Sequence, residues 1–245
     1  MRSAGTARIV VGTAAVLALV TSCSSGDGDG GASTAHKAPR SSPSAQKART
    51  TGLTRIPGVG DRLRGQIPGN SRQVVAVYGE GADSADSTVV LYAKHGSTWD
   101  QAARWKGHNG KKGWTTDHRE NDKRSPVGVY TLSDAGGVLA DPGARLPYTQ
   151  TASIQAPHYW AKSHWHDFDY VVAIDYNRVK GTPPNDPSRP EGQTKGGSIW
   201  LHMDHGSGTS ACVSIPKAGM RTLLTTLDPA RHPVVVMGDK KHLSA

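Results

Sequence analysis

The sequence predicts a mostly β domain with one or two short helices. Short runs of β-branched and aromatic residues alternate with stretches rich in Gly, Asp, Ser and Pro, which is typical of strands joined by loops. Clear helical spacing of apolar residues is confined to one stretch near the C-terminus. The segment 56–245 is long enough to bury its own core and has no internal repeat, so we expect a single domain.

The first half of this domain is expected to be rich in strands. Two strands are predicted at 72–78 and 87–94, each with β-branched and aromatic residues. A run at 97–106 places tryptophans among polar residues, and a turn-rich loop follows at 107–114. A Pro-Val-Gly turn then leads into a strand within 125–132.

The second half contains the predicted helix. Strands are expected at 170–176 and 198–203, and between them 178–197 is a long, Pro-rich irregular loop of the kind that often forms a lid or a flexible segment. Leucines at helical spacing predict a helix over 217–227, with a proline near its start. A buried strand is expected at 233–237.

The N-terminus is typical of an exported protein. Arg2 and Arg8 give a positively charged start before an apolar run, 9–20, that is too short for a stable membrane anchor. The run leads into Val-Thr-Ser-Cys, which resembles the bacterial lipobox. We therefore expect 1–22 to be a lipoprotein signal peptide and Cys23 to carry lipid, so that the protein is anchored at the outer face of the membrane or in the wall. The alternative is a plain signal peptide with an incidental cysteine.

Residues 23–55 are predicted to be a disordered, basic tether rich in Ser and Gly. They hold almost no large apolar side chain, so they cannot bury enough surface to offset the entropy of ordering. The net charge of +9 includes this stretch and the leader. No basic stripe is interleaved with aromatic residues, so we expect no nucleic-acid partner. Anionic polymers of the cell envelope are the expected electrostatic partners.

The chain has 2 cysteines, Cys23 and Cys212. If Cys23 carries lipid, Cys212 has no disulfide partner. A lone thiol in an oxidising compartment is either a nucleophile or a buried structural residue. Composition leaves both interpretations open.

The segment 199–216 reads IWLHMDHGSGTSACVSIP and brings an imidazole close in sequence to the second cysteine. An ordinary thiol is only a few per cent ionised at neutral pH, so a catalytic cysteine needs a base beside it. His202 lies near the end of a predicted strand, and a hairpin-like return through the Gly/Ser-rich loop could place Cys212 against it. Backbone N–H groups around Ala211 and Cys212 could then stabilise an oxyanion.

These residues resemble the active-site motif of the L,D-transpeptidase (YkuD-like) catalytic domain. In that family a strand ends in an apolar-x-His unit, and after a glycine-containing loop a Ser/Thr-x-Gly-Cys turn presents the nucleophile. The matching segments here are 199–202 and 209–212. The segment 124–130 resembles the family's Pro-x-Gly turn before a strand, and 107–113 resembles its Gly-x-Asn-Gly loop. The likeness extends over most of 70–240.

The chain departs from the family pattern around the cysteine. Ala211 stands where the family has glycine, Ser210 where many members have histidine, and Met203 where glycine or serine often follows the histidine. Ser214 replaces a frequent arginine, and the loop 203–211 is shorter than usual. These differences concern recognition of the substrate carboxylate and the choice of donor.

The resemblance implies a β-sandwich fold and a cysteine acyltransferase that forms 3-3 cross-links in peptidoglycan or attaches other amines. Cys212 would be the nucleophile, and His202 the general base and acid, oriented by a backbone carbonyl such as that of Met203. Ser210, Ala211 and Met203 are the candidate oxyanion or supporting residues. No cofactor is implied; the partners are donor and acceptor stem peptides, and we expect a monomer. An L,D-carboxypeptidase or endopeptidase of the same fold and a non-catalytic wall-binding lipoprotein are the alternatives.

Asp204 and His205 lie beside His202 in the sequence and could complete a triad. We favour a polar loop exposed to solvent for both. His205 is kept as a reserve base, because the short loop could bring it near the sulfur.

Histidines and aspartates also cluster between 158 and 169: His158, His164, His166, Asp167 and Asp169. Such residues can bind zinc or copper, but their spacing fits no common motif, and we predict no metal. We expect a polar surface loop with an aromatic patch at the rim of the substrate cleft. The patch residues are Tyr159, Trp160 and Trp165.

Overall fold

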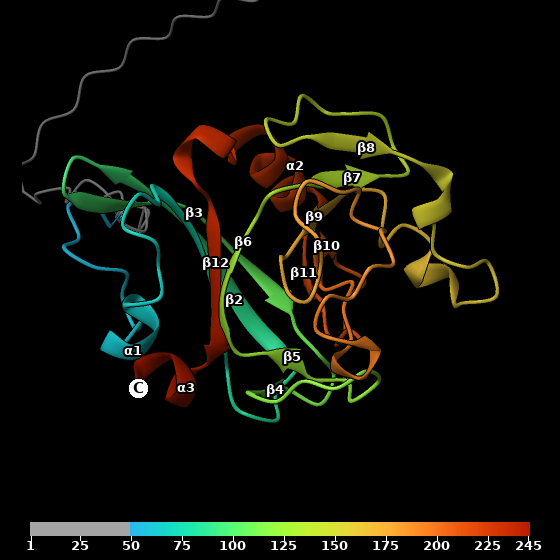
Figure 1. Ribbon diagram of the computed structural model, residues 1–245, viewed down its shortest axis with the longest axis horizontal. Coiled ribbons are helices and arrows are strands. Elements are labelled where there is room, and N and C mark those ends of the chain that lie inside the picture. The colour runs from blue at the N-terminus through green and yellow to red at the C-terminus, as the bar shows by residue number, and fades with distance from the viewer. Residues whose placement is uncertain (1–49) are drawn as a thin grey trace, which may run out of the picture. The chain divides into compact units, whose positions relative to one another are not determined.

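The computed structural model describes residues 50–245, and this part of the chain is mostly β with a few short helices, which confirms the predicted class (Figure 1). The candidate lipidation site Cys23 and the leader lie outside the described residues. The strands are β1 (Gln73–Gly79), β2 (Asp86–His95), β3 (Thr98–His108), β4 (Trp114–Thr115), β5 (Ser125–Pro126), β6 (Gly128–Thr131), β7 (Ala135–Gly137), β8 (Tyr148–Gln150), β9 (Val171–Ala173), β10 (Trp200–Met203), β11 (Val213–Ile215) and β12 (Val234–Asp239).

Within residues 50–245, ten strands form one sheet in the order β6-β12-β1-β2-β3-β11-β10-β9-β7-β8, while β4 and β5 pair separately. The run at 97–106 is strand β3, which pairs along β2. The strand predicted at 170–176 is shorter than expected: the ladder of β9 ends at Ala173, and the chain turns at Asn177, whose φ of 43° lies in the left-handed region.

The α-helices are short. They are α1 (Asp61–Arg64), α2 (Lys217–Thr226) and α3 (Lys240–Ser244), and the 3₁₀ turns are η1 (Ala152–Ile154), η2 (Lys162–His164), η3 (Gln193–Lys195) and η4 (Pro229–Arg231). Only α2 is predicted by the sequence, because α1 and α3 have too few residues to show a period. Asp239 caps α3 by accepting hydrogen bonds from the N–H groups of Lys241 and His242. In the described part of the chain no helix combines the length and apolar character needed to cross a membrane.

Strand β1 is buried on both faces, which explains its continuous apolar sequence. Val75 and Val77 point into one hydrophobic cluster, and Val74 and Ala76 point into another on the opposite face. The second cluster is closed by Leu63 of α1 and Leu243 of α3, among others. A strand covered on both sides has no polar face, so its residues need not alternate.

The first cluster lies inside the curl of the sheet. It combines residues of β1, β2 and β12 with residues of β9, β10 and β11, so the two halves of the sheet share one core. Helix α2 completes this core and lies between the two halves in Figure 1. Its buried residues in the cluster are Met220, Leu223 and Leu224.

The folded part of the chain begins earlier than predicted. Residues 50–55 were expected to belong to the tether, but Leu53 and Trp99 exchange backbone hydrogen bonds of 2.9 and 2.8 Å, and the N–H of Gln101 donates to the carbonyl of Thr50. Leu53 also packs on the hydrophobic cluster behind β1. Pairing with β3 therefore orders a segment whose composition alone suggests disorder.

The Pro-rich loop 178–197 is irregular apart from η3, as expected, and is held at several points. The guanidinium of Arg178 is buried and contacts the carboxylates of Asp134 (2.9 Å) and Asp175 (2.5 Å). The side-chain amide of Asn177 donates to two carbonyls near the far end of the loop. The indole of Trp200 donates to the carbonyl of Pro184 at 3.1 Å, which joins the loop to β10.

Replacing Arg178 tests how far this loop depends on buried charge. Arg178→Ala leaves the buried carboxylates of Asp134 and Asp175 without their cation, so we expect the free energy of unfolding to fall by about 3–5 kcal/mol. Urea denaturation of the full chain measures this. Arg189→Ala is the control, since Arg189 donates only to carbonyls and the Ser198 hydroxyl, and should cost about 1 kcal/mol. An equal loss of stability in the two variants would show that the buried ion pairs of Arg178 are not what holds the loop.

Candidate active site

Strands β10 and β11 are adjacent and parallel, with Leu201 opposite Val213. Successive side chains of a strand point to opposite faces of the sheet, so the neighbours of Leu201 and Val213 in the chain point to the face opposite theirs. His202 in β10 and Cys212, directly before β11, therefore lie on the same face. The predicted hairpin-like return is wrong, because the connection 204–212 crosses back before the second strand begins. Both side chains nevertheless line the same cleft.

The crossing loop is held by the loop that follows β3. The carbonyl and N–H of Thr209 bond to Lys111 N (2.8 Å) and Asn109 O (2.9 Å). Asn109 is buried, and its side chain bonds to Ser87 and to the carbonyl of Ser84. A Cβ on Gly110 would lie 2.7 Å from the carbonyl oxygen of Lys123, so glycine is needed at this close approach. The Gly-x-Asn-Gly segment is therefore part of the site.

Ser125 joins the same loop to the cysteine turn. Its hydroxyl accepts a hydrogen bond from the N–H of Gly110 at 2.9 Å and donates to the carbonyl of Ala211 at 2.5 Å. The carbonyl of Cys212 accepts from the Thr209 hydroxyl at 2.6 Å. Three segments far apart in sequence thus converge on the residues just before the sulfur.

Cys212 is half-buried at the wall of a cleft. Its Sγ lies 3.4 Å from the N–H of Trp200, which donates to it, and 3.5 Å from the carbonyl of Ser198, which accepts from it. Burial raises the pKa of Cys212 to about 11, the charge of Asp167 adds to the rise, and the N–H groups of Trp200 and Cys212 oppose it. At pH 7 only about one molecule in 10,000 then carries a thiolate, so the sulfur needs a base when it reacts.

His202 can act as that base. Its Nδ1 lies 2.8 Å from the carbonyl of Met203, as the resemblance implied. A carbonyl only accepts, so Nδ1 carries the proton and Nε2 keeps its lone pair. Burial lowers the pKa of His202, and the charge of Asp167 opposes this only in part. The imidazole is therefore neutral near pH 7 and can accept a proton.

The candidate oxyanion donors divide into two groups. The N–H of Met203 donates to the carbonyl of Asp167 at 2.9 Å, so Met203 supports the site through its own carbonyl and has no N–H to offer. The N–H groups of Ser210 and Ala211 donate to none of the described residues. These two amides stay available for a developing negative charge beside Cys212.

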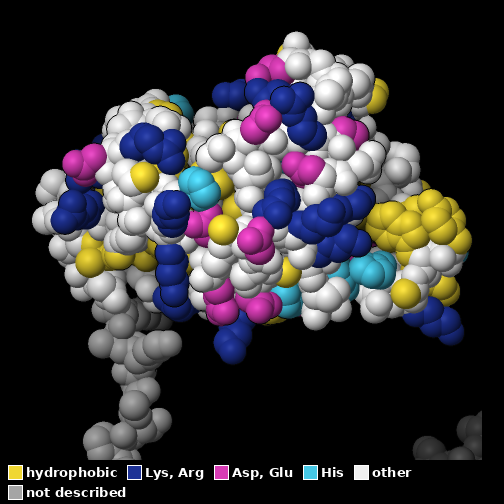
Figure 2. All heavy atoms as spheres, turned by 90° about the horizontal axis from the view of Figure 1, so that it is seen from below, with side chains coloured by type: hydrophobic (Ala, Val, Ile, Leu, Met, Phe, Trp, Pro, Cys, Tyr) yellow, Lys and Arg dark blue, Asp and Glu magenta, His cyan; other side chains and the backbone are white. Residues whose placement is uncertain are grey.

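Cys212 and His202 line a cleft of about 700 Å³, together with His205, Ser210 and Trp160. Tyr159, next to Trp160, is 86% exposed. Figure 2 shows an exposed hydrophobic patch beside histidine and basic side chains on one face of the molecule. An aromatic residue at the rim, as expected, gives the cleft an apolar edge.

Asp204 is only partly exposed to solvent, contrary to expectation. Its carboxylate accepts hydrogen bonds from His108 Nδ1 and Ser214 Oγ, each at 2.7 Å. Despite partial burial, these bonds hold the pKa of Asp204 below its usual value. Asp204 thus ties the start of the loop to β3 and β11, while the ring of His202 is held by a backbone carbonyl.

His205 is also not exposed, because the loop turns back into the cleft. Its side chain is 3% exposed, and its Nδ1 lies 3.1 Å from Oδ2 of Asp167. This carboxylate raises the pKa of His205 against the effect of burial. The rings of His205 and His202 lie nearly parallel, with their centroids 6.2 Å apart.

The cluster between 158 and 169 does not form one site. His158 stacks on Trp165, and His166 pairs with Asp169 at 3.1 Å. The predicted polar surface loop is only partly correct, since the aspartates are buried: Asp167 is 4% and Asp169 7% exposed. The two aspartates are buried because the chain enters the core here, with the buried strand β9 beginning two residues after Asp169.

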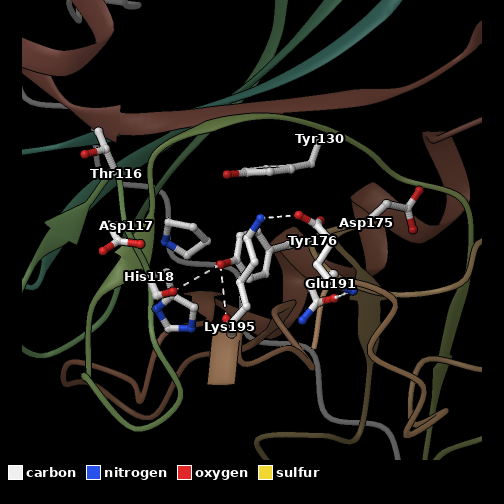
Figure 3. A pocket seen from close by; sticks show the side chains of 10 residues that line it. Thr116, Asp117, His118, Tyr130, Asp175, Tyr176, Glu191 and Lys195 are labelled. Carbon is white, nitrogen blue, oxygen red and sulfur yellow. Dashed lines mark hydrogen bonds and ion pairs between the residues drawn. The ribbon is translucent and has the colours of Figure 1, made fainter. Parts of the chain in front are cut away.

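A second, smaller pocket of about 280 Å³ has no lining residue in common with the cysteine cleft. Figure 3 shows Tyr176 at its centre, with its hydroxyl donating to the carbonyl of Lys195 at 3.1 Å, and Lys195 paired with Glu191. His118 and Asp117 face the same space. No sequence motif predicts this pocket, because its residues come from unrelated loops.

Comparisons of the chain with models of known protein families and with curated proteins give no match. The site is therefore characterised by its geometry. A half-buried thiol, a neutral imidazole on the same face and Ser210 line one cleft, and the amide of Ala211 lies next to it in the chain. This set of groups suits nucleophilic attack on an acyl group.

The pKa of Cys212 predicts its rate of alkylation. With the pKa near 11, the reactive thiolate should increase about tenfold per pH unit from about pH 7 to 10, whereas a free thiol with a pKa of about 8.5 levels off. Iodoacetamide labelling of a Cys23→Ser chain, followed by intact mass, measures the rate. A Cys212→Ala chain controls for other sites. A plateau below pH 8 would show that the thiol is instead acidic.

Proposed function

We propose that the domain is a cysteine acyltransferase of the L,D-transpeptidase (YkuD-like) kind that forms 3-3 cross-links in peptidoglycan. The observation that carries the proposal is the convergence of three segments on the cysteine turn. Gly110 and Ser125 lie in the segments 107–113 and 124–130 that resemble the family's loop and turn. The N–H of Gly110 donates to the hydroxyl of Ser125, and this hydroxyl donates to the carbonyl of Ala211. The curled, mostly β fold is compatible with the family's β-sandwich.

In the first half of the reaction, His202 removes the proton from Cys212 as the sulfur attacks the carbonyl carbon of the third stem residue. The carbonyl oxygen becomes an oxyanion, which the N–H groups of Ser210 and Ala211 stabilise. The tetrahedral intermediate collapses, the C–N bond breaks, and the imidazolium returns the proton to the departing amine of the terminal D-amino acid. The product is a thioester on Cys212.

In the second half, an acceptor amine attacks the thioester. His202 takes a proton from this amine, the C–S bond breaks, and the sulfur is reprotonated by the imidazolium. An amine from a second stem peptide gives a 3-3 cross-link, and water in its place gives L,D-carboxypeptidase activity. The open cleft beside Ser210 leaves room for either acceptor.

The ionisation states set the order of events. The thiol of Cys212 and the imidazole of His202 are both neutral near pH 7, so proton transfer must accompany attack. The sulfur must also leave its hydrogen bond with the Ser198 carbonyl to meet the base. Catalytic hydrogen bonds often form only once substrate is bound, which allows this change.

The proposal includes export and anchoring. A lipid on Cys23 would hold the enzyme at the outer face of the membrane, where stem peptides are the donor and acceptor. The chain stays net positive after loss of Arg2 and Arg8 with the leader, so it is attracted to anionic wall polymers at that surface.

Paired histidine variants test the choice of base. We expect His202→Ala to slow acylation of Cys212 by about 100-fold to 10,000-fold, because a neutral thiol needs a proton acceptor. His205→Ala should keep most of the rate, since its ring contacts Asp167. Stopped-flow acylation by a carbapenem measures both, with circular dichroism as the control for folding. The reverse pattern would make His205 the base.

The reaction itself is tested with a disaccharide tetrapeptide and mass spectrometry of the products. We expect a cross-linked dimer, with a trimmed monomer if water competes, and a covalent adduct on Cys212 after carbapenem treatment. Cys212→Ala should abolish formation of the dimer and the trimmed monomer, and of the covalent adduct. Trimmed monomer alone would identify a hydrolase, and an unchanged substrate with no adduct on the wild type would favour a non-catalytic wall-binding lipoprotein.

A further inference from the structure

The acyl transfer proposed above does not use one group of residues in the same cleft. His164, Asp167 and His205 each offer a ligand atom, and these atoms lie within 4.8 Å of one another. We propose that these three residues bind a divalent transition-metal ion, with Zn²⁺ as the preferred ion, beside Cys212. Two imidazole nitrogens and one carboxylate oxygen are a ligand set that zinc uses in open sites.

The contacts of Asp167 define the centre of this site. Its Oδ2 lies 2.9 Å from Nδ1 of His164 and 3.1 Å from Nδ1 of His205. The two imidazole rings have their centroids 4.1 Å apart and are tilted by 52° to each other. One carboxylate oxygen therefore already holds two imidazoles close together, and small changes in side-chain torsion would let all three ligate one ion.

The burial of His205 is an independent sign of a missing ligand. Its side chain is 3% exposed, its Nδ1 has only the 3.1 Å contact with Oδ2 of Asp167, and its Nε2 has no hydrogen bond to any of the described residues. A buried polar group without a partner costs free energy, and native proteins rarely leave one in that state. A metal–nitrogen bond would satisfy one of these nitrogens.

The nearby ion pair of His166 and Asp169 provides a comparison for the proposed metal ligands. It has the same spacing as His164 and Asp167 and a similar distance, 3.1 Å, but the side chain of His166 is 75% exposed. No third ligand joins it in the described chain. His166 therefore offers a matched control for His164.

Strand pairing explains why the sequence did not predict this site. The histidines and aspartates of 158–169 fit no metal motif, and the third ligand, His205, comes from a distant loop. Antiparallel pairing of β9 with β10 and the bond from Met203 N to Asp167 O bring the two segments together. The expectation of no metal rested on spacing within one segment alone.

The geometry also indicates what the ion could do. All three ligands line the cysteine cleft, so a coordination position not taken by protein would open toward the cleft. Water, or an oxygen or nitrogen of a molecule in the cleft, could occupy it. The ion would thus bind or orient a cleft ligand without using Cys212, which is not part of the group.

Metal titration of the full chain tests the proposal directly. We would strip the protein with a chelator, use a Cys23→Ser background to remove the other thiol, and titrate Zn²⁺ by calorimetry. We expect one ion per chain, with binding weakened by about 100-fold or more in His205→Ala and His164→Ala, since even loss of a residue that only supports a metal ligand costs about 10–100-fold. His166→Ala and Cys212→Ala should bind like the parent, which separates this result from the proposed acyl transfer.

Cobalt provides a second readout. Co²⁺ in a His₂Asp site should give weak visible bands without a thiolate charge-transfer band, and the bands should disappear in His205→Gln, a variant that keeps the side chain polar. Circular dichroism checks that each variant is folded. Equal zinc affinity in the parent and His205→Ala would overturn the proposal, as would an equal loss in His166→Ala, which would indicate binding by surface histidines only.

Discussion

Parallel pairing between β10 and β11 places His202 and Cys212 on the same face of neighbouring strands, and the remaining features of the site depend on it. The pairing requires the loop 204–212 to cross back before β11. Two contacts hold the crossing loop in place: Thr209 pairs with Gly110 in the loop after β3, and the hydroxyl of Ser125 donates to the carbonyl of Ala211. These contacts rigidify the turn that carries the sulfur and so keep the reactive group in position.

Burial gives this thiol and imidazole a particular electrostatic character. Desolvation disfavours the charged form of both groups, so it raises the pKa of Cys212 and lowers that of His202. A neutral thiol resists oxidation, because a thiol reacts far more slowly than a thiolate. The proposed chemistry therefore begins only when a substrate provides the electrophile and the oxyanion amides of Ser210 and Ala211 become occupied.

Asp167 connects the two proposals. Its charge disfavours ionisation of Cys212 and favours protonation of His202, while its Oδ2 contacts the two histidines of the proposed metal site. Its backbone carbonyl also accepts the N–H of Met203, whose carbonyl orients His202. One buried residue thus links the acyl-transfer groups to the metal ligands.

The sequence by itself determined the mostly β class, the positions of β1, β2 and helix α2, and the candidate pair of His202 and Cys212. Local periodicity and residue chemistry carry that information. Only the tertiary structure decided the parallel direction of β10 and β11, the burial of Asp204 and His205, and the meeting of His205 with Asp167. These depend on pairing between residues far apart in the chain, and a linear pattern does not record which loop crosses over which strand.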